Sequence, residues 1–119
     1  MRQIKAFVRS GAVDQVVRAL EAAGVPGVTV STVHGVGYGY EPEHFTLAPR
    51  DVAHAPRIGK VEVVCRAQDT DRLVRAIADA ARSGLAGDGI VDVAPVERAV
   101  KVRTGEEGPQ ALATLGRQE

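Results

Sequence analysis

Residues 76–93, AIADAARSGLAGDGIVDV, contain a helical pattern that ends in a glycine-rich turn and passes directly into a β-rich run. Residues 19–33, ALEAAGVPGVTVSTV, repeat the same succession of helix end, Gly-x-x-Gly turn and β-rich run. Two such units in one short chain predict a protein made of two β-α-β halves.

The residues around each repeat supply the rest of each half. In residues 3–9, QIKAFVR, apolar and other side chains alternate, which predicts a strand that begins almost at residue 2. A helix is expected next, followed by the strand in residues 27–36. The positions that support this helix are its apolar stripe and a glycine at its C-terminal cap: Val13, Val16, Val17, Leu20 and Gly24.

The second half follows the same order. KVEVVCR, residues 60–66, predicts a strand, and a helix capped by Asp69 or Thr70 should follow it. Its buried stripe is Leu73, Ile77 and Ala80, and Arg82 suits its negative C-terminal end. Two short strands are expected afterwards, IVDVAPV in residues 90–96 and RAVKVR in residues 98–103.

The predicted fold class is α+β, a ferredoxin-like split arrangement with a four-stranded antiparallel sheet and both helices on one face. The other face should present Val-rich side chains, and an uncovered apolar face predicts a partner subunit. With only two Phe, two Tyr and no Trp, the core must be built from smaller side chains, which also favours oligomerisation.

The segment 35–59 has no sustained hydrophobic period. It holds four glycines, three prolines and two histidines. A long segment of this kind in a compact domain tends to be functional, so we expect a functional loop here; the alternative is a disordered loop without a role.

Composition excludes several classes of protein. The formal net charge is +0 with no basic block, which argues against a nucleic-acid partner. No apolar run approaches the roughly 20 residues that span a bilayer, and Lys5 and Arg9 interrupt the first apolar segment, unlike a signal peptide. The single Cys65 excludes an internal disulfide, so a reducing cytoplasm is the expected location.

Motifs for catalysis are absent from the sequence: it has no G-x-S-x-G, H-E-x-x-H or Walker A pattern, and we expect no enzyme. Cys65 is predicted to be a small core residue. His34, His44 and His54 lack the spacing of metal ligands on a regular element, although a loop can gather ligands from a distance. The adjacent Glu106 and Glu107 are expected in a solvated turn.

The Gly87–Asp88–Gly89 turn follows a helix and precedes a strand, the reverse of a P-loop. Its glycines allow backbone N–H groups to converge on an anion. Asp88 would repel a phosphate unless a hydroxyl, an amine or a cation met it, so the turn suits a ligand with a phosphate and a donor group. Lys101 and Arg103, on one side of the expected last strand, either hold a polyphosphate at a subunit boundary or are solvated cations.

Several stretches taken in order resemble the P-II family of signal transduction proteins, over nearly the whole chain to about Gly108. They are IKAFVR, VDQVVRALEAAGVPGVTV, VHGVG, KVEVV and the segment 76–108. The most specific is GDG followed, at the family's separation, by V-x-R-T-G-E. The resemblance implies a domain of residues 1–108, a tail of residues 109–119 and a homotrimer with a nucleotide in each of three clefts between subunits.

The resemblance also implies roles for individual residues. The base would contact Gly27, Val28, Thr29 and Val64, and Glu62 matches a further residue of the cleft. The phosphates would meet the backbone at Gly35, Val36, Gly37, Gly87, Asp88 and Gly89, with Lys101 and Arg103 supplied by a neighbour. The long loop matches the family's T-loop, about residues 37–57, which docks on a target protein; the candidate contacts are Tyr38, Tyr40, His44 and Asp51.

The sequence departs from the family pattern at several contacts. The early Pro-Phe-Lys is Ser10–Ala12, the glutamine that helps bind magnesium and 2-oxoglutarate is Gly39, and the loop tyrosine that some members modify is Asp51. Two lysines are replaced by Ile58 and Ile90. Because a charge-assisted contact contributes about 1.5–3 kcal/mol, losing two lysines should weaken triphosphate binding by about a hundredfold or more.

The sequence therefore predicts a non-enzymatic sensor that prefers ADP or AMP to ATP with magnesium, with bicarbonate or another small anion as a further effector. It would regulate a target, such as a membrane transporter or a metabolic enzyme, in nitrogen or carbon metabolism. The alternative is a trimer of the same fold that binds a metal or small anion through loop histidines.

Overall fold

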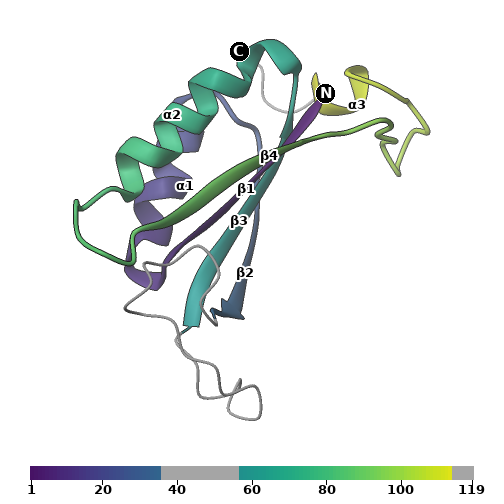
Figure 1. Cartoon of the computed structure of the whole chain (residues 1–119). Coiled ribbons are helices and arrows are strands. Elements are labelled where there is room, and N and C mark those ends of the chain that lie inside the picture. Colours follow the sequence, from purple (N-terminus) through teal and green to yellow (C-terminus); the bar gives the residue numbers. More distant parts are fainter. Residues whose placement is uncertain (36–56, 114–119) are drawn as a thin grey trace.

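The structure is a computed structural model, and it describes residues 1–35 and 57–113 of the chain. Figure 1 shows one sheet with two helices packed against one of its faces. Among the described residues no helix is long and apolar enough to cross a membrane.

The sheet has four strands in the order β2-β3-β1-β4, and all three pairings are antiparallel. The strands are β1 (Arg2–Arg9), β2 (Thr29–His34), β3 (Arg57–Cys65) and β4 (Gly89–Pro95). β1 lies in the centre and pairs along its length with β3 on one side and β4 on the other. The predicted ferredoxin-like arrangement is confirmed.

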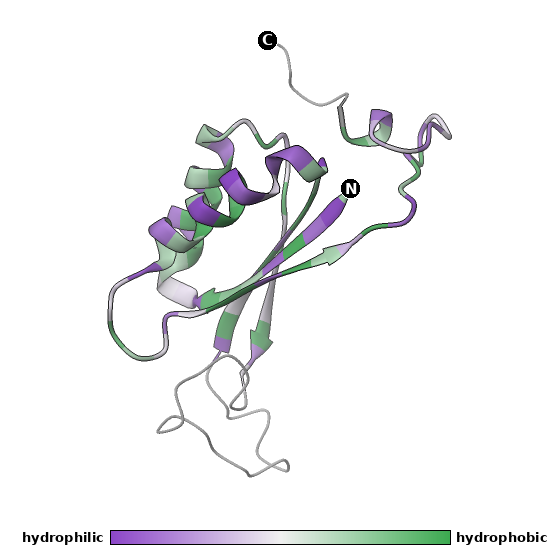
Figure 2. Cartoon of the chain, turned by 45° about the horizontal axis from the view of Figure 1, so that its top comes forward, coloured by the Kyte–Doolittle hydropathy of each residue, from purple (hydrophilic) through white to green (hydrophobic). Residues whose placement is uncertain are grey.

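The two main helices are α1 (Val13–Ala22) and α2 (Thr70–Ala81), each preceded by a single 3-10 turn. Both are amphipathic, and Figure 2 shows hydrophobic and hydrophilic residues mixed along each of them. The predicted stripes are confirmed in part: Val16, Leu20, Leu73 and Ile77 are buried. Val13, Val17 and Ala80 are only half-buried, and Ala81 is buried instead of Ala80. The buried side chains pack on the helix-facing residues of the sheet, chiefly Ile4, Ala6, Val8, Val61, Val63 and Cys65.

Two helix ends differ in how well the sequence predicted them. Gly24 follows α1 with φ +93, and its N–H donates to the Glu21 carbonyl, as a C-terminal glycine should. Asp69 stands at the N-cap of α2 but makes no side-chain cap hydrogen bond. Its carboxylate instead accepts from Arg72 at 3.2 Å, and the Thr70 hydroxyl donates to the Arg66 carbonyl at 3.4 Å. The predicted side-chain capping by Asp69 or Thr70 is therefore wrong.

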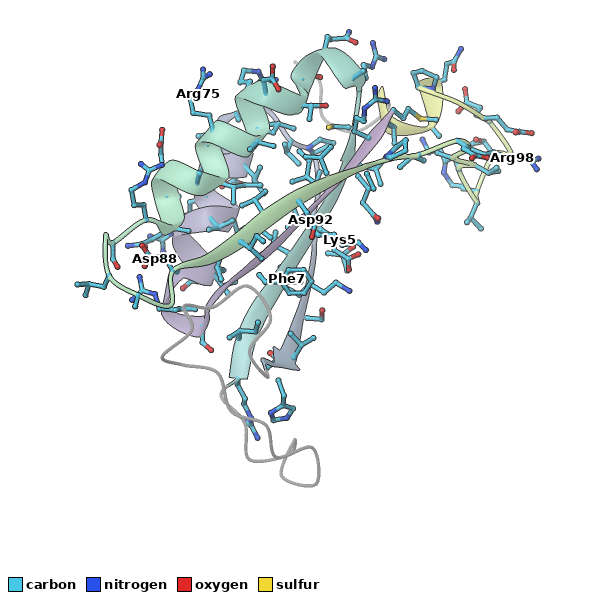
Figure 3. All side chains as sticks on the ribbon, viewed as in Figure 1. Lys5, Phe7, Arg75, Asp88, Asp92 and Arg98 are labelled. Carbon is cyan, nitrogen blue, oxygen red and sulfur yellow. The ribbon has the colours of Figure 1, made fainter. Side chains whose placement is uncertain are left out.

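The sheet face away from the helices also differs from expectation. Because side chains alternate along a strand, the valines and other apolar residues that face the helices leave a mixed set for the other side. We call this set the open face; it consists of Gln3, Lys5, Phe7, Thr29, Ser31, Val33, Ile58, Lys60, Glu62, Val64, Ile90, Asp92 and Ala94. It is not Val-rich, and Lys5 lies in register between Glu62 and Asp92 (Figure 3).

The predicted strand in residues 98–103 is not formed. Beyond β4 the chain continues as an arm that leaves the sheet beside the N-terminus (Figure 1). The arm has a single bridge, Val100 to Glu107, around a turn in which the Lys101 N–H donates to the Glu106 carbonyl at 2.8 Å. Lys101 and Arg103 therefore lie in a turn, and they do not share one side of a strand.

The arm is tied internally and ends in a short helix. Arg98 holds Glu107 through two N–H groups, at 2.8 and 3.2 Å. Val102, between the two predicted phosphate-binding cations, is 97% exposed, so the turn projects from the body of the chain. The arm continues into α3 (Gln110–Ala113), which lies in the predicted tail.

Candidate functional site

The residues predicted to bind a nucleotide fall into two groups along the sheet. Gly89 pairs with Val8 near the end of β1, whereas Val64 pairs with Gln3 near its start. Gln3 and Val8 are five positions apart along β1, which corresponds to about 16 Å at about 3.3 Å per residue. One chain therefore holds two separate groups of predicted site residues. We call the end of the sheet around Gly89 the glycine end and the opposite end, around Val64, the base end.

The glycine end contains the loop 82–88 between α2 and β4, together with Gly35, which follows β2 and is buried. Gly84, Gly87 and Gly89 have φ values of +86, +91 and +112, which only glycine adopts readily. These conformations turn the chain sharply from the helix into the sheet. The backbone of Gly87 to Gly89, where a phosphate was expected, is half-buried to exposed.

Asp88 is held by donors from its own chain. Its Oδ1 accepts from the Ser83 hydroxyl at 2.6 Å and lies 3.1 Å from the Arg9 guanidinium. Its Oδ2 accepts from the backbone N–H groups of Ser83 at 2.7 Å and Gly84 at 2.9 Å. The Ser83 hydroxyl, the two N–H groups and the charge of Arg9 together lower the pKa of the Asp88 carboxyl.

This geometry corrects one inference from the sequence. A ligand with a donor group was expected because an unpaired Asp88 would repel phosphate. The structure supplies the hydroxyl and the cation from Ser83 and Arg9, so the expectation of a donor on the ligand loses its basis. Neither residue was singled out from the sequence, although Ser83 stands at the end of the predicted helix pattern.

The base end contains a cavity of ≈ 580 Å³. Gly27 and Val64, two of the predicted base contacts, both line it, and Leu112 of α3 lines it as well. Pairing between β2 and β3 ends at Thr29 and Glu62, so the edge of β3 beyond Glu62 borders the cavity instead of a strand. The cavity is lined mainly by apolar residues, with Arg66, Asp69 and Arg72 also among its lining residues.

Other predicted site residues lie near the base end but outside the cavity. Thr29 and Glu62 are paired across β2 and β3, and Glu62 forms an ion pair with Lys60 at 3.7 Å. Lys101 and Arg103 lie in the arm beyond β4, at the same end of the sheet. The glycine end of the same chain therefore lacks these predicted cations.

The remaining candidates cannot be located. Val36, Gly37, Tyr38, Gly39, Tyr40, His44, Asp51 and His54 lie outside the described residues. Within residues 1–35 and 57–113, no group of three or more His, Cys, Asp or Glu side chains could hold a metal ion.

Comparison with known proteins identifies the family. The model of the family described as nitrogen regulatory protein P-II matches residues 1–106. The chain belongs to the P-II family. It is 37% identical to the nitrogen regulatory protein P-II of Cereibacter sphaeroides and 36% identical to that of Azospirillum brasilense, each over 115 residues. Both alignments cover 94% of this chain and 100% of the relative.

A solved P-II structure agrees with the fold. The crystal structure of Arabidopsis thaliana PII bound to citrate matches with a TM-score of 0.76 at 32% identity, covering 98% of this chain and 94% of that one. P-II proteins are regulatory signal transducers without enzymatic activity, and this chain is one of them. The resemblance inferred from the GDG and V-x-R-T-G-E stretches is thus confirmed, and the metal-binding alternative is not favoured.

Proposed function

We propose that this P-II protein acts in the cytoplasm as a homotrimer that binds an adenine nucleotide in clefts between its subunits. The bound nucleotide controls how the T-loop, expected at about residues 37–57, engages a target protein. A nucleotide can act in this way only if it binds one state of the protein better than another.

The separation of the two ends of the sheet is the observation that carries this proposal. The base end holds Gly27 and Val64 at a cavity, and the glycine end lies about 16 Å away along β1. One ribose joins a base to its phosphates, so a single chain cannot easily offer both ends to one ligand. A second copy, with its base end beside the glycine end of the first, would complete the site.

The projecting arm supports the same arrangement. Lys101 and Arg103 lie in a turn at the base end, and the exposure of Val102 shows that this turn stands away from its own body. A neighbouring copy is therefore the natural recipient of these cations. P-II family proteins are trimeric, and a three-fold arrangement would place each arm at one neighbour.

The charges at the glycine end favour a ligand with few phosphates. Ile90, 38% exposed, follows the glycine turn, and Ile58 stands opposite Arg9. Each replaces a lysine of the family pattern, while Arg9 is already engaged with Asp88. We therefore propose ADP or AMP as the preferred nucleotide over ATP with magnesium.

A small anion is the second proposed effector. The Arabidopsis relative was solved with citrate bound, which supports a carboxylate or bicarbonate as a ligand class here. The relatives carry the name of nitrogen regulatory proteins, and a target in nitrogen or carbon (bicarbonate) metabolism, either a transporter or an enzyme, fits that family role.

The test is calorimetric titration of the full chain with AMP, ADP, ATP and ATP with magnesium, with light scattering on the same sample. We expect a trimer that binds ADP or AMP at least tenfold more tightly than ATP with magnesium. Arg103→Ala should weaken ADP binding, whereas Arg75→Ala, on the exposed side of α2 (Figure 3), should not. A monomer, or no binding of any nucleotide at millimolar concentration, would refute the proposal.

A further inference from the structure

The loop before β4 is organised around one carboxylate. All four contacts of Asp88 come from the chain itself: two backbone N–H groups, one hydroxyl and one guanidinium. The Ser83 hydroxyl also accepts from the Leu85 N–H at 3.1 Å. The amides of Ser83, Gly84 and Leu85 are therefore used inside the loop, and its first half is closed on itself.

The second half of the loop is fixed by Gly89, which lies against β1, and by the contacts of Asp88 with Ser83. Gly89 approaches β1 so closely that an added Cβ would lie 1.9 Å from the Phe7 carbonyl oxygen. Asp88, next to it, is tied back to Ser83. The Gly87–Gly89 backbone is thus held from both sides, in the region where phosphate binding is proposed.

Arg9 joins this loop to a rigid part of the sheet. Arg9 is the last residue of β1 and pairs with Ile58 of β3. The next residue, Ser10, donates its hydroxyl proton to the Arg57 carbonyl at 2.9 Å. The backbone that carries the guanidinium is therefore anchored, and the ion pair at 3.1 Å fixes Asp88 relative to β1.

Arg9 also changes the charge that a phosphate would meet. An isolated carboxylate beside the Gly87–Gly89 backbone would repel an anion, because like charges a few ångströms apart interact strongly near a protein surface. The guanidinium, 3.1 Å from the Asp88 Oδ1, offsets that charge. The side chain of Arg9 thus fixes the position of Asp88 and also offsets its negative charge.

We propose that Arg9 and Ser83 are positioning residues for phosphate recognition. They hold Asp88 so that the Gly87–Gly89 backbone stays in one conformation and so that the Asp88 charge does not oppose the ligand. This inference rests on the proposed nucleotide function and extends it to two residues, Arg9 and Ser83, that were not among the predicted site residues.

The experiment compares Arg9→Gln and Ser83→Ala with the conservative variants Arg9→Lys and Ser83→Thr, all in the full-length chain. The matched control is Arg82→Gln at the first residue of the same loop; it breaks an exposed ion pair with Asp79 (3.0 Å) and leaves the described contacts of Asp88 unchanged. Affinity for ADP is measured by calorimetry, and affinity for adenosine by displacement of ADP. Amide hydrogen exchange of residues 83–89 is followed in the free proteins.

Arg9→Gln and Ser83→Ala should each lower ADP affinity about tenfold and speed exchange at the Ser83 and Gly84 amides, with adenosine affinity changed less than twofold. Arg9→Lys and Ser83→Thr should recover most of the loss, and Arg82→Gln should match the wild type. Equal losses for ADP and adenosine, or unchanged ADP affinity, would overturn this inference alone. A wild type that binds no ADP would overturn the proposed function and this inference together.

Discussion

Gly89 meets Phe7 so closely that any β-carbon at position 89 would lie 1.9 Å from the Phe7 carbonyl oxygen. The same residue has φ +112, a conformation that L-amino acids with a side chain rarely adopt. The start of β4 can therefore lie against β1 only with glycine at this position. This contact sets where the glycine end stands relative to the sheet.

Gly89→Ala should destabilise the fold by about 2 kcal/mol or more, because it adds a backbone clash to an unfavourable φ. Gly87→Ala is the matched control, since Gly87 has φ +91 but nothing within 4 Å of its added Cβ. It should cost only about 1–2 kcal/mol. Urea unfolding of both variants measures the difference, and equal losses would show that the Phe7 contact does not constrain the loop.

Asp88 should make stability depend on pH in the acid range. Its pKa is lowered in the fold, so the unfolded chain binds the proton first as pH falls. The contribution of Asp88 is fully present above the ordinary aspartate pKa of about 3.9 and is lost as pH falls through the lower pKa of the folded state. Asp88→Asn should lack this dependence.

Thermal unfolding from pH 6 to pH 3 tests this prediction. The wild type should lose more stability than Asp88→Asn between about pH 4 and pH 3. Asp79→Asn serves as the control, because that carboxylate pairs only with Arg82 on the exposed side of the chain among the contacts described. Parallel pH profiles for wild type and Asp88→Asn would show that the loop does not depend on the carboxylate.

We predict that the open face supports the proposed trimer through mixed polar and apolar contacts. Lys5 stands in register between Glu62 and Asp92, so Lys5→Glu would place three carboxylates in one row across three strands. Like charges directly opposite on neighbouring strands are destabilising, and the row would also repel a neighbouring copy. Light scattering should show dissociation of the trimer.

Arg75→Glu is the control for that experiment, since Arg75 is exposed on α2, on the other side of the molecule (Figure 3). It makes the same change of charge and should leave the assembly intact. If Lys5→Glu remained trimeric at micromolar concentration, the open face would not be the surface that joins the copies.

Ile90→Lys should raise affinity for ATP relative to ADP. Ile90 is opposite Phe7 in register, one residue beyond the glycine turn, and is 38% exposed. A new charge-assisted contact of about 1.5 kcal/mol would increase the ratio of ATP to ADP affinity about tenfold. Ile90→Gln, similar in length but uncharged, should change the ratio little; a similar gain from both variants would argue against the role of charge.

The sequence by itself determined the order of the four strands and two main helices. The alternation of Ile4, Ala6 and Val8 and the helical spacing of Leu73 and Ile77 are local patterns, because strand and helix periods follow from the backbone of a few consecutive residues. The glycine stops were readable for the same reason, since a positive φ is a property of one residue. The family could also be predicted from the sequence, because its most specific signature is a short contiguous stretch.

Tertiary structure decided everything that depends on pairing between distant residues. Residues 98–103 have a β-rich pattern, yet the pairing of β4 with β1 ends at Pro95 and Arg2, and beyond it the Val96 N–H donates to the Met1 carbonyl. A strand needs a neighbour, and in the described part of the chain residues 98–103 form only one β-bridge, that of Val100 with Glu107. The partners of Asp88 likewise include Arg9 from the opposite end of the sequence. The division of the site between two ends of the sheet follows from the register along β1, which no local pattern encodes.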